Sequence, residues 1–184
     1  AQTVMFDSLV ALVKMVSPVL SFTAEEMWAA MPAIARDADS VHLSSWYVEN
    51  PEFINAELDS KWDKIIKLRK EVNKVLEKAR QGENRIIGNS LDAEVSLFIG
   101  NDEYKSLLAD KELLEMIFII SKLNIVETKD DSFTESEELK DISIKVAHAT
   151  GEKCERCWKY SEELGTHEEH STICPRCTGV LVNN

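Results

Sequence analysis

Two Cys-x-x-Cys pairs near the end of the chain constrain its folding more than any other feature of the sequence. The first pair is Cys154 and Cys157, the second is Cys174 and Cys177, and sixteen residues separate them. Each Cys-x-x-Cys turn places two thiolates together, and two such turns supply the four sulfur ligands of a tetrahedral Zn²⁺. Because protein atoms would fill all four positions, the pattern predicts one structural zinc ion rather than a catalytic one.

Other uses of these cysteines are open from the sequence. A redox-active pair is expected beside a thioredoxin-like βαβ unit, which the neighbouring residues do not predict. Structural disulfides are typical of secreted chains, and no signal segment is evident. His170 in place of one cysteine would give a Cys3His site, although His167 and His170 are expected to be exposed. A module this small has little core, so zinc would supply its folding free energy.

Basic and aromatic residues surround the cysteines, namely Arg156, Trp158, Lys159 and Arg176. Cationic side chains bind phosphate, and an indole stacks on an unpaired base, so these four residues predict a contact with nucleic acid. In the alternative interpretation, Trp158 covers the metal site and the basic side chains are solvated.

The charge of the chain is unevenly distributed. A formal net charge of −12 argues against indiscriminate binding of nucleic acid. Nevertheless, nine basic residues and four acidic ones lie between Lys61 and Arg85, whereas residues 127–141 hold seven acids and two lysines. We therefore predict a basic helix face toward phosphates, formed by Lys61, Lys64, Lys67, Lys70, Lys74 and Lys78. The alternative is a solvated face with ion pairs such as Lys67 with Glu71.

Apolar residues at helical spacing predict a helical first part of the chain. One helix covers residues 3–20 and is bent or ended at Pro18. A second helix is expected to begin at Thr23, with a capping box to Glu26 and a hydrophobic staple between Phe22 and Met27.

A long helix over residues 51–81 carries an apolar seam for another helix and stops at Gly82. Residues 33–51 are expected to be irregular, with an extended piece at 41–46. Trp28, Trp46 and Trp62 are expected in the core.

The pattern changes after Gly82. Alternating apolar residues predict strands near 93–99, 123–126 and 142–148, with helices over 103–120 and an acidic loop over 127–141. The predicted fold class is therefore mainly α with a small α+β unit. The predicted domains are a helical bundle at 1–82, a mixed subdomain at 83–150 and a zinc ribbon or knuckle at 151–184.

Motifs of catalysis are not evident. The sequence has no Walker loop, no GxGxxG, no HExxH and no GxSxG, and its carboxylates fall in solvated runs. No apolar run approaches the roughly 20 residues that a membrane span needs. The chain opens at Ala1 without a methionine and with apolar periodicity already at Val4, which predicts a piece of a longer protein.

Several segments resemble a known family. Residues 22–28, FTAEEMW, and residues 40–43, SVHL, followed by Trp46, resemble the anticodon-binding domain of class I aminoacyl-tRNA synthetases for aliphatic amino acids. Residues 85–93, RIIGNSLDA, are similar to a segment of isoleucyl-tRNA synthetases. Residues 151–158, GEKCERCW, and the closing CPRC at 174–177 resemble the zinc module that ends the bacterial-type isoleucyl enzymes.

The resemblance implies a C-terminal fragment of a cytoplasmic ligase that joins isoleucine to its tRNA with ATP. The HIGH and KMSKS signatures of the catalytic core are missing from this sequence, so the fragment would bind tRNA at the anticodon stem and loop without catalysing or binding ATP. Its expected partners are isoleucine tRNA and the catalytic core of the same polypeptide, with no membrane, and it is expected to be monomeric.

Two further hypotheses come from other classes of protein. A zinc-containing DNA-repair glycosylase ends in a similar pair of Cys-x-x-Cys motifs. That hypothesis predicts a helix-two-turn-helix motif before the zinc site, where this sequence predicts a β-rich acidic stretch. A structural brace within a larger enzyme is the other, because the apolar seam of the long helix can face a further domain.

Overall fold

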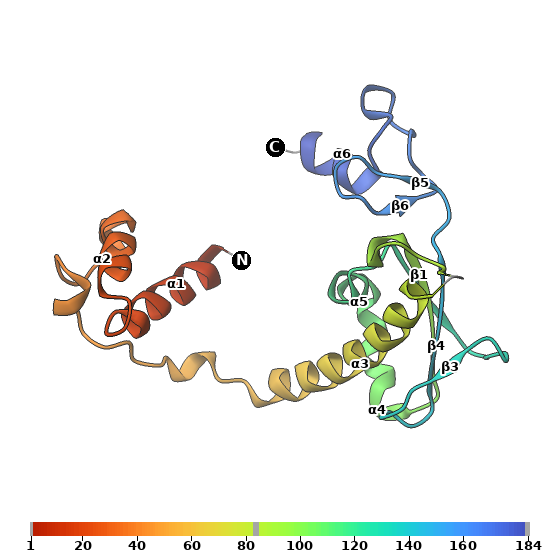
Figure 1. Cartoon of the computed structure of the whole chain (residues 1–184), viewed down its shortest axis with the longest axis horizontal. Helices are drawn as coiled ribbons and strands as arrows, with labels where there is room; N and C mark the ends of the chain where they lie inside the picture. Colours follow the sequence, from red (N-terminus) through yellow and green to blue (C-terminus); the bar gives the residue numbers. More distant parts are fainter. Residues whose placement is uncertain (1, 83–84, 183–184) are drawn as a thin grey trace. The chain divides into compact units, whose positions relative to one another are not determined.

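The computed structural model describes residues 2–82 and 85–182 and divides the chain into two compact units, residues 1–55 and 56–184. The first unit is helical, and the second combines helices with a small mixed sheet (Figure 1). The predicted class, mainly α with a small α+β part, is confirmed at this level. Within the described residues, no helix is both long enough and apolar enough to cross a membrane.

The first unit consists of two helices and three 3₁₀ turns. Helix α1 spans Gln2–Val16 and helix α2 spans Ser21–Ala30, and the turns cover Ala33–Ala35, Val41–Leu43 and Pro51–Phe53. Its small core contains Val13, Ala24, Trp28, Met31 and Val41. The buried Trp28 ring donates its Nε1 hydrogen to the carbonyl of Ala38 at 3.0 Å, so the irregular segment after α2 is tied to the helix pair.

Helix α2 begins earlier than the sequence predicts, and the predicted capping box and staple are wrong. The N–H of Leu20 bonds to the carbonyl of Val16, and the N–H of Ala24 bonds to the carbonyl of Leu20. The turn after α1 therefore runs directly into α2, and Thr23 lies inside the first turn instead of capping it. Phe22 is 90% exposed and forms no staple.

The prediction of an extended segment over residues 41–46 is wrong for its first three residues. Residues Val41–Leu43 form a 3₁₀ turn, capped by the Ser40 hydroxyl, which accepts a hydrogen bond from the N–H of His42. The carboxylate of Glu25 on α2 accepts hydrogen bonds from the Ser40 hydroxyl and the N–H of Val41. These contacts hold the segment against α2, where it cannot pair as a strand.

The second unit is built on a four-stranded sheet with the order β2-β1-β4-β3, in which β1 pairs parallel to β2 and antiparallel to β4. The strands are β1 (Ala93–Ile99), β2 (Lys122–Val126), β3 (Thr134–Glu135) and β4 (Ile142–His148); the helices are α3 (Ala56–Arg80), α4 (Asp102–Lys105) and α5 (Lys111–Phe118). Every second residue of β1 is buried, which confirms the predicted alternation.

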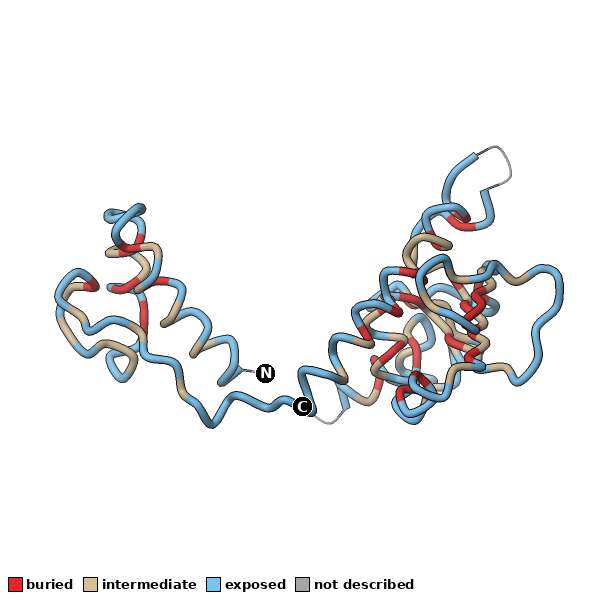
Figure 2. The backbone as a smooth tube through the Cα atoms, turned by 90° about the horizontal axis from the view of Figure 1, so that it is seen from below, coloured by how far each residue is buried: buried red, intermediate tan, exposed pale blue. Residues whose placement is uncertain are grey.

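Helices α3 and α5 cover the sheet (Figure 1), and Figure 2 shows buried stretches in each of the two units. The buried side of α3 consists of Ile65, Leu68, Glu71, Val72, Leu76 and Ala79. The predicted seam therefore packs against β4 as well as against a helix. By its contacts, the long helix groups with the residues that follow it, so the first unit ends at residue 55. The division into 1–82, 83–150 and 151–184 stays a prediction about which segments fold independently.

Only one of the three tryptophans expected in the core is buried. Trp28 is fully buried, whereas Trp46 is 62% exposed and Trp62 is 38% exposed. Trp62 lies on the first half of α3, before the stretch that meets the sheet, and Trp46 lies in an irregular segment. Helix α3 ends where the sequence predicts, because Gly82 adopts the left-handed conformation at φ 87° that favours glycine.

A buried carboxylate links α3 to the acidic segment that precedes β4. Glu71 is 2% exposed, and its Oε1 lies 2.7 Å from the Nζ of Lys74. Its Oε2 accepts hydrogen bonds from the Ser136 hydroxyl and from the N–H of Glu137 at 2.7 Å. Burial alone would raise the pKa of Glu71, but Lys74 and these donors outweigh it and lower the pKa to about 2.

We expect Glu71→Gln to destabilise this unit by about 3 kcal/mol at pH 7, because the pKa is lowered from 4.5 to about 2 and each unit of pKa shift equals about 1.4 kcal/mol. The folded-state pKa lies below the ordinary value of 4.5, so the stabilisation is present above that pH and is lost as the pH falls toward 2. Denaturant unfolding at several pH values checks this. Glu77→Gln, at the exposed partner of Arg80, is the control and should change little. A difference between wild type and Glu71→Gln that persists at low pH would contradict the assignment.

Candidate zinc centre and its surroundings

The four predicted ligands meet in the structure. The Sγ atoms of Cys154, Cys157, Cys174 and Cys177 all lie within 4.8 Å of one another. The Sγ atoms of Cys157 and Cys174 are 3.7 Å apart, close to the roughly 3.8 Å edge of a tetrahedron with Zn–S bonds of about 2.3 Å. Among the described residues this group contains the cysteines alone; the rings of His167 and His170 stack on each other, with centroids 5.4 Å apart.

Local backbone geometry positions each cysteine pair. The hairpin of β5 (Glu152–Lys153) and β6 (Tyr160–Ser161) encloses the first pair, and the N–H of Cys154 donates to the carbonyl of Lys159 at 2.9 Å. Cys174 directly precedes helix α6 (Pro175–Val182), whose first turn carries Cys177. The hairpin begins at Gly151, where φ is 91° and an added Cβ would lie 2.4 Å from the backbone of Ser161, so only glycine fits.

The thiols form a donor set that suits a divalent cation. Burial opposes ionisation of Cys154, but backbone N–H groups, including those of Cys157 and Cys174, lower its pKa to about 6. Burial, together with the thiols of Cys154, Cys177 and Cys174, raises the pKa of Cys157 to about 12. Four thiolates this close repel one another unless a cation lies between them. The cluster therefore fits one structural Zn²⁺, with no ligand position left for water.

The zinc module is joined to the sheet by a serine that the sequence analysis missed. The Ser121 hydroxyl accepts a hydrogen bond from the N–H of Tyr160 at 2.7 Å and donates one to the carbonyl of Leu91. Two ion pairs add to this junction, Lys122 with Glu162 at 3.4 Å and Lys153 with Asp92 at 3.4 Å. A single serine before a strand gives no sequence signal, because its role depends on a partner 39 residues away.

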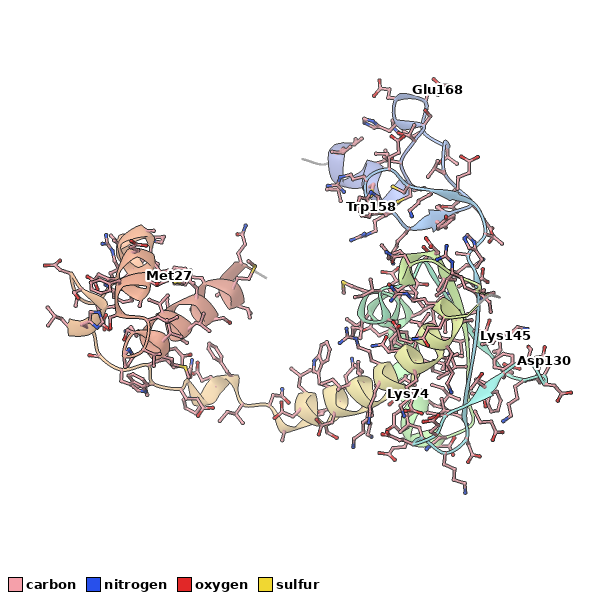
Figure 3. All side chains as sticks on the ribbon, viewed as in Figure 1. Met27, Lys74, Asp130, Lys145, Trp158 and Glu168 are labelled. Atoms are coloured by element: carbon pink, nitrogen blue, oxygen red, sulfur yellow. The ribbon has the colours of Figure 1, made fainter. Side chains whose placement is uncertain are left out.

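Three of the four residues predicted to contact nucleic acid around the zinc site line two different hollows. Lys159 and Arg176 line a groove between the zinc module and α5. Trp158 lines a separate hollow with Lys153 and Glu155. Its ring is mostly exposed and donates from Nε1 to the carbonyl of Glu155 at 3.2 Å (Figure 3). Lys159 and Arg176 therefore line a different hollow from the one that Trp158 lines.

Most lysines of the predicted basic face on α3 contact carboxylates. The ion pairs are Lys61 with Asp110 (3.8 Å), Lys64 with Glu103 (3.3 Å), Lys70 with Glu138 (2.7 Å), Lys74 with Glu71 (2.7 Å) and Lys78 with Glu137 (3.5 Å). Figure 3 marks Lys74 on this face. The suggested pairing of Lys67 with Glu71 is wrong, and Lys67 has no ion pair within the described part of the chain. The acidic segment therefore neutralises the part of this face that Lys70, Lys74 and Lys78 form.

We expect Cys174→Ser to abolish zinc binding and to unfold residues 151–182 while the helices within residues 1–80 stay folded. The core of the module consists of cysteines with Leu164 and Ile173, so little remains to hold it without the metal. Native mass spectrometry reports the zinc content, and hydrogen exchange reports which segments lose protection. Thr172→Ser, at an exposed position, is the control. Loss of protection throughout the chain would instead make the zinc module integral to the whole fold.

Comparison with known proteins identifies two segments of the chain. Residues 1–97 match the family model described as the anticodon-binding domain of tRNA ligase, and residues 151–178 match the zinc finger found in FPG and IleRS. The finger description names two classes of protein, so the finger alone does not separate them. The match over residues 1–97 separates the two classes, because its description names a tRNA ligase. The glycosylase hypothesis is therefore not favoured.

Curated relatives match almost the whole chain. The isoleucine–tRNA ligase of Desulforamulus reducens is 43% identical over 183 residues, and those of Kosmotoga olearia and Thermotoga petrophila are 40% and 41% identical. Each alignment covers 98% of this chain but only 19% of the relative, so the chain spans about a fifth of the length of these proteins. The resemblance to isoleucyl-tRNA synthetases is confirmed, and since the first model matches residues 1–97 of 184, the chain belongs to the family of anticodon-binding domains of tRNA ligases.

Proposed function

We propose that this chain binds tRNA at the anticodon stem and loop as part of an isoleucine–tRNA ligase. One observation carries the proposal: an anticodon-binding match over residues 1–97 is followed by the zinc-finger match over 151–178. Isoleucine–tRNA ligases match across both segments. Binding, rather than bond-making, is the role assigned to this chain, and amino-acid activation with ATP is assigned to the catalytic core of the same enzyme.

The finer assignments follow from this proposal. Residues 1–82 act as a helical anticodon-binding bundle, residues 83–150 as a mixed subdomain and residues 151–184 as a zinc ribbon or knuckle. Cys154, Cys157, Cys174 and Cys177 hold one structural Zn²⁺, a role that their mutual distances support. The chain acts as a monomer in the cytoplasm, with isoleucine tRNA and the rest of the enzyme as its partners.

The zinc module offers the cations that are most available to RNA. Arg156, Lys159 and Arg176 make no ion pair within the described residues, and the exposed Trp158 ring is free to stack on a base. Most α3 lysines would exchange a carboxylate for a phosphate. Exposed ion pairs are worth only about 0.2–1 kcal/mol each, so this exchange is feasible but brings little net gain.

A brace within the larger enzyme is the second candidate function. Helix α1 exposes the apolar side chains of Met5 (71%), Leu12 (55%) and Met15 (58%) at a spacing that places them on one side of the helix. Such a stripe favours contact with further protein. Both functions can belong to one chain, but only the first requires that the chain itself bind RNA.

The decisive experiment measures binding of the zinc-loaded chain to isoleucine tRNA and to a non-cognate tRNA across a salt series. We expect cognate-preferring binding that weakens steeply with salt, since phosphate contacts release counterions. Trp158→Ala should weaken it by about tenfold, because base–aromatic stacking is worth about 1–3 kcal/mol. Trp158→Phe keeps a stacking ring and should retain most of the affinity.

A chain that carries one zinc, unfolds cooperatively and binds neither tRNA would contradict RNA binding and favour the brace. Equal binding of both tRNAs would keep the electrostatic contact but remove anticodon recognition from this chain.

The acidic segment gives a further expectation about α3. Glu137→Gln with Glu138→Gln should strengthen RNA binding by about tenfold, because it releases Lys70 and Lys78 from exposed ion pairs, whereas Lys74 stays paired with Glu71. The slope of log K against log salt should steepen by about two if Lys70 and Lys78 then reach phosphates.

The matched control is Glu127→Gln with Asp131→Asn, which removes the same charge from exposed positions of the same segment. Glu71 should keep its anchor, since it also bonds the backbone N–H groups of residues 137 and 138. Equal gains in the two double variants would show that only net charge matters and that α3 does not contact RNA.

A further inference from the structure

The groove between the zinc module and α5 combines features that point to a ligand. Its volume is about 850 Å³, within the range of small-molecule sites. Lys159 and Arg176 of the zinc module line it, together with Leu113, Met116 and Ile119 on and beside α5. The Ser121 hydrogen bond to the N–H of Tyr160 fixes the hairpin to the sheet, so the groove is held open by contacts within the chain.

The charges that remain available in the groove are mostly positive. Two of its three carboxylates are already engaged, because Asp110 pairs with Lys61 at 3.8 Å and Glu115 accepts a hydrogen bond from the N–H of Leu123 at 3.0 Å. Lys159 and Arg176 make no ion pair within the described ranges. Two cations and the carboxylate of Glu112 are therefore left to meet a ligand.

The α5 side of the groove supplies an apolar surface whose exposure the fold does not explain. Met116 is 61% exposed and Ile119 is 48% exposed. Ile119 ends α5 in the left-handed conformation at φ 57°, where glycine is the favoured residue and a β-branched side chain is strained. Strained backbone conformations occur often at functional sites, and Ile119 lines the same groove as Lys159 and Arg176.

We propose that this groove receives one unpaired nucleotide of the bound RNA. The base lies against Met116 and Ile119, its phosphate meets Lys159 and Arg176, and the Glu112 carboxylate accepts a hydrogen bond from an exocyclic amine. An apolar surface beside cations suits a nucleotide because it offers a base face and an anion together. The inference rests on the proposed tRNA binding and adds a site that neither the basic face of α3 nor the Trp158 hollow contains.

The test uses the zinc-loaded 184-residue chain and an isoleucine tRNA transcript as the probe. Ile119→Gly is the central variant, because glycine relieves the strained φ while deleting the side chain, so the fold should be at least as stable as wild type. We expect this variant and Met116→Ala each to weaken binding by fivefold or more. Arg176→Ala should weaken binding and reduce the salt slope by about one. Ile86→Ala, at an isoleucine that is 49% exposed outside the groove, is the matched control and should bind as wild type does.

A second measurement assigns the effect to one nucleotide. Unpaired nucleotides of the transcript are replaced one at a time by abasic residues and tested against wild type and Ile119→Gly in double-mutant cycles. One position should bind both proteins equally weakly, because base and side chain are partners in the same contact. If the chain binds tRNA but Ile119→Gly, Met116→Ala and Arg176→Ala bind as tightly as wild type, the groove proposal is overturned and the proposed function stands. If the chain binds no tRNA, both fail.

Discussion

The second unit depends on the contact between α3 and the sheet, and the buried carboxylate of Glu71 is the most demanding part of that contact. The apolar residues around it supply non-directional attraction, but a buried charge requires particular donors at particular distances. Lys74, the Ser136 hydroxyl and two backbone N–H groups meet that requirement. Because the Ser136 hydroxyl and the two N–H groups belong to the acidic segment, the carboxylate also determines where that segment lies on the helix.

This arrangement separates two populations of cations in a chain whose net charge is −12. Lys70, Lys74 and Lys78 of α3 lie in ion pairs with Glu137 and Glu138 of the acidic segment, so their charges are met within the same unit. Arg156, Lys159 and Arg176 of the zinc module have no such partners among the described residues, although Lys153 pairs with Asp92. An acidic protein can thus present a small positive surface to a polyanion while its larger basic cluster is occupied by its own carboxylates.

Sequence reasoning succeeded where a short local pattern determines the structure. The alternation along β1 and the glycine at the end of α3 appear where they were expected. The cysteine spacing predicted a cluster because two tight turns leave few other arrangements of four thiols. Sequence reasoning failed where contacts with distant segments determine the local structure. The start of α2 depends on the turn after α1, and the partners of Lys70 and Lys74 come from a loop more than 60 residues away. Exposure of Trp46 and Trp62 follows from which part of each segment meets a core, which hydrophobicity alone does not reveal.

The backbone conformation at Trp158 affects how much conformational entropy its side chain would lose on binding a ligand. Its φ of 64° is unfavourable for a large side chain, and the turn between Cys154 and Cys157 imposes it, with the N–H of Trp158 bonded to the carbonyl of Cys154. Together with the hydrogen bond from its Nε1 to the carbonyl of Glu155, this turn restricts the indole before any ligand arrives, so less conformational entropy would be lost if a base stacked on it. A zinc ion bound by Cys154 and Cys157 would stabilise this turn and would thereby restrict the Trp158 ring, although the ring is not a ligand. Zinc would thus lower the conformational-entropy cost of binding without taking part in any reaction.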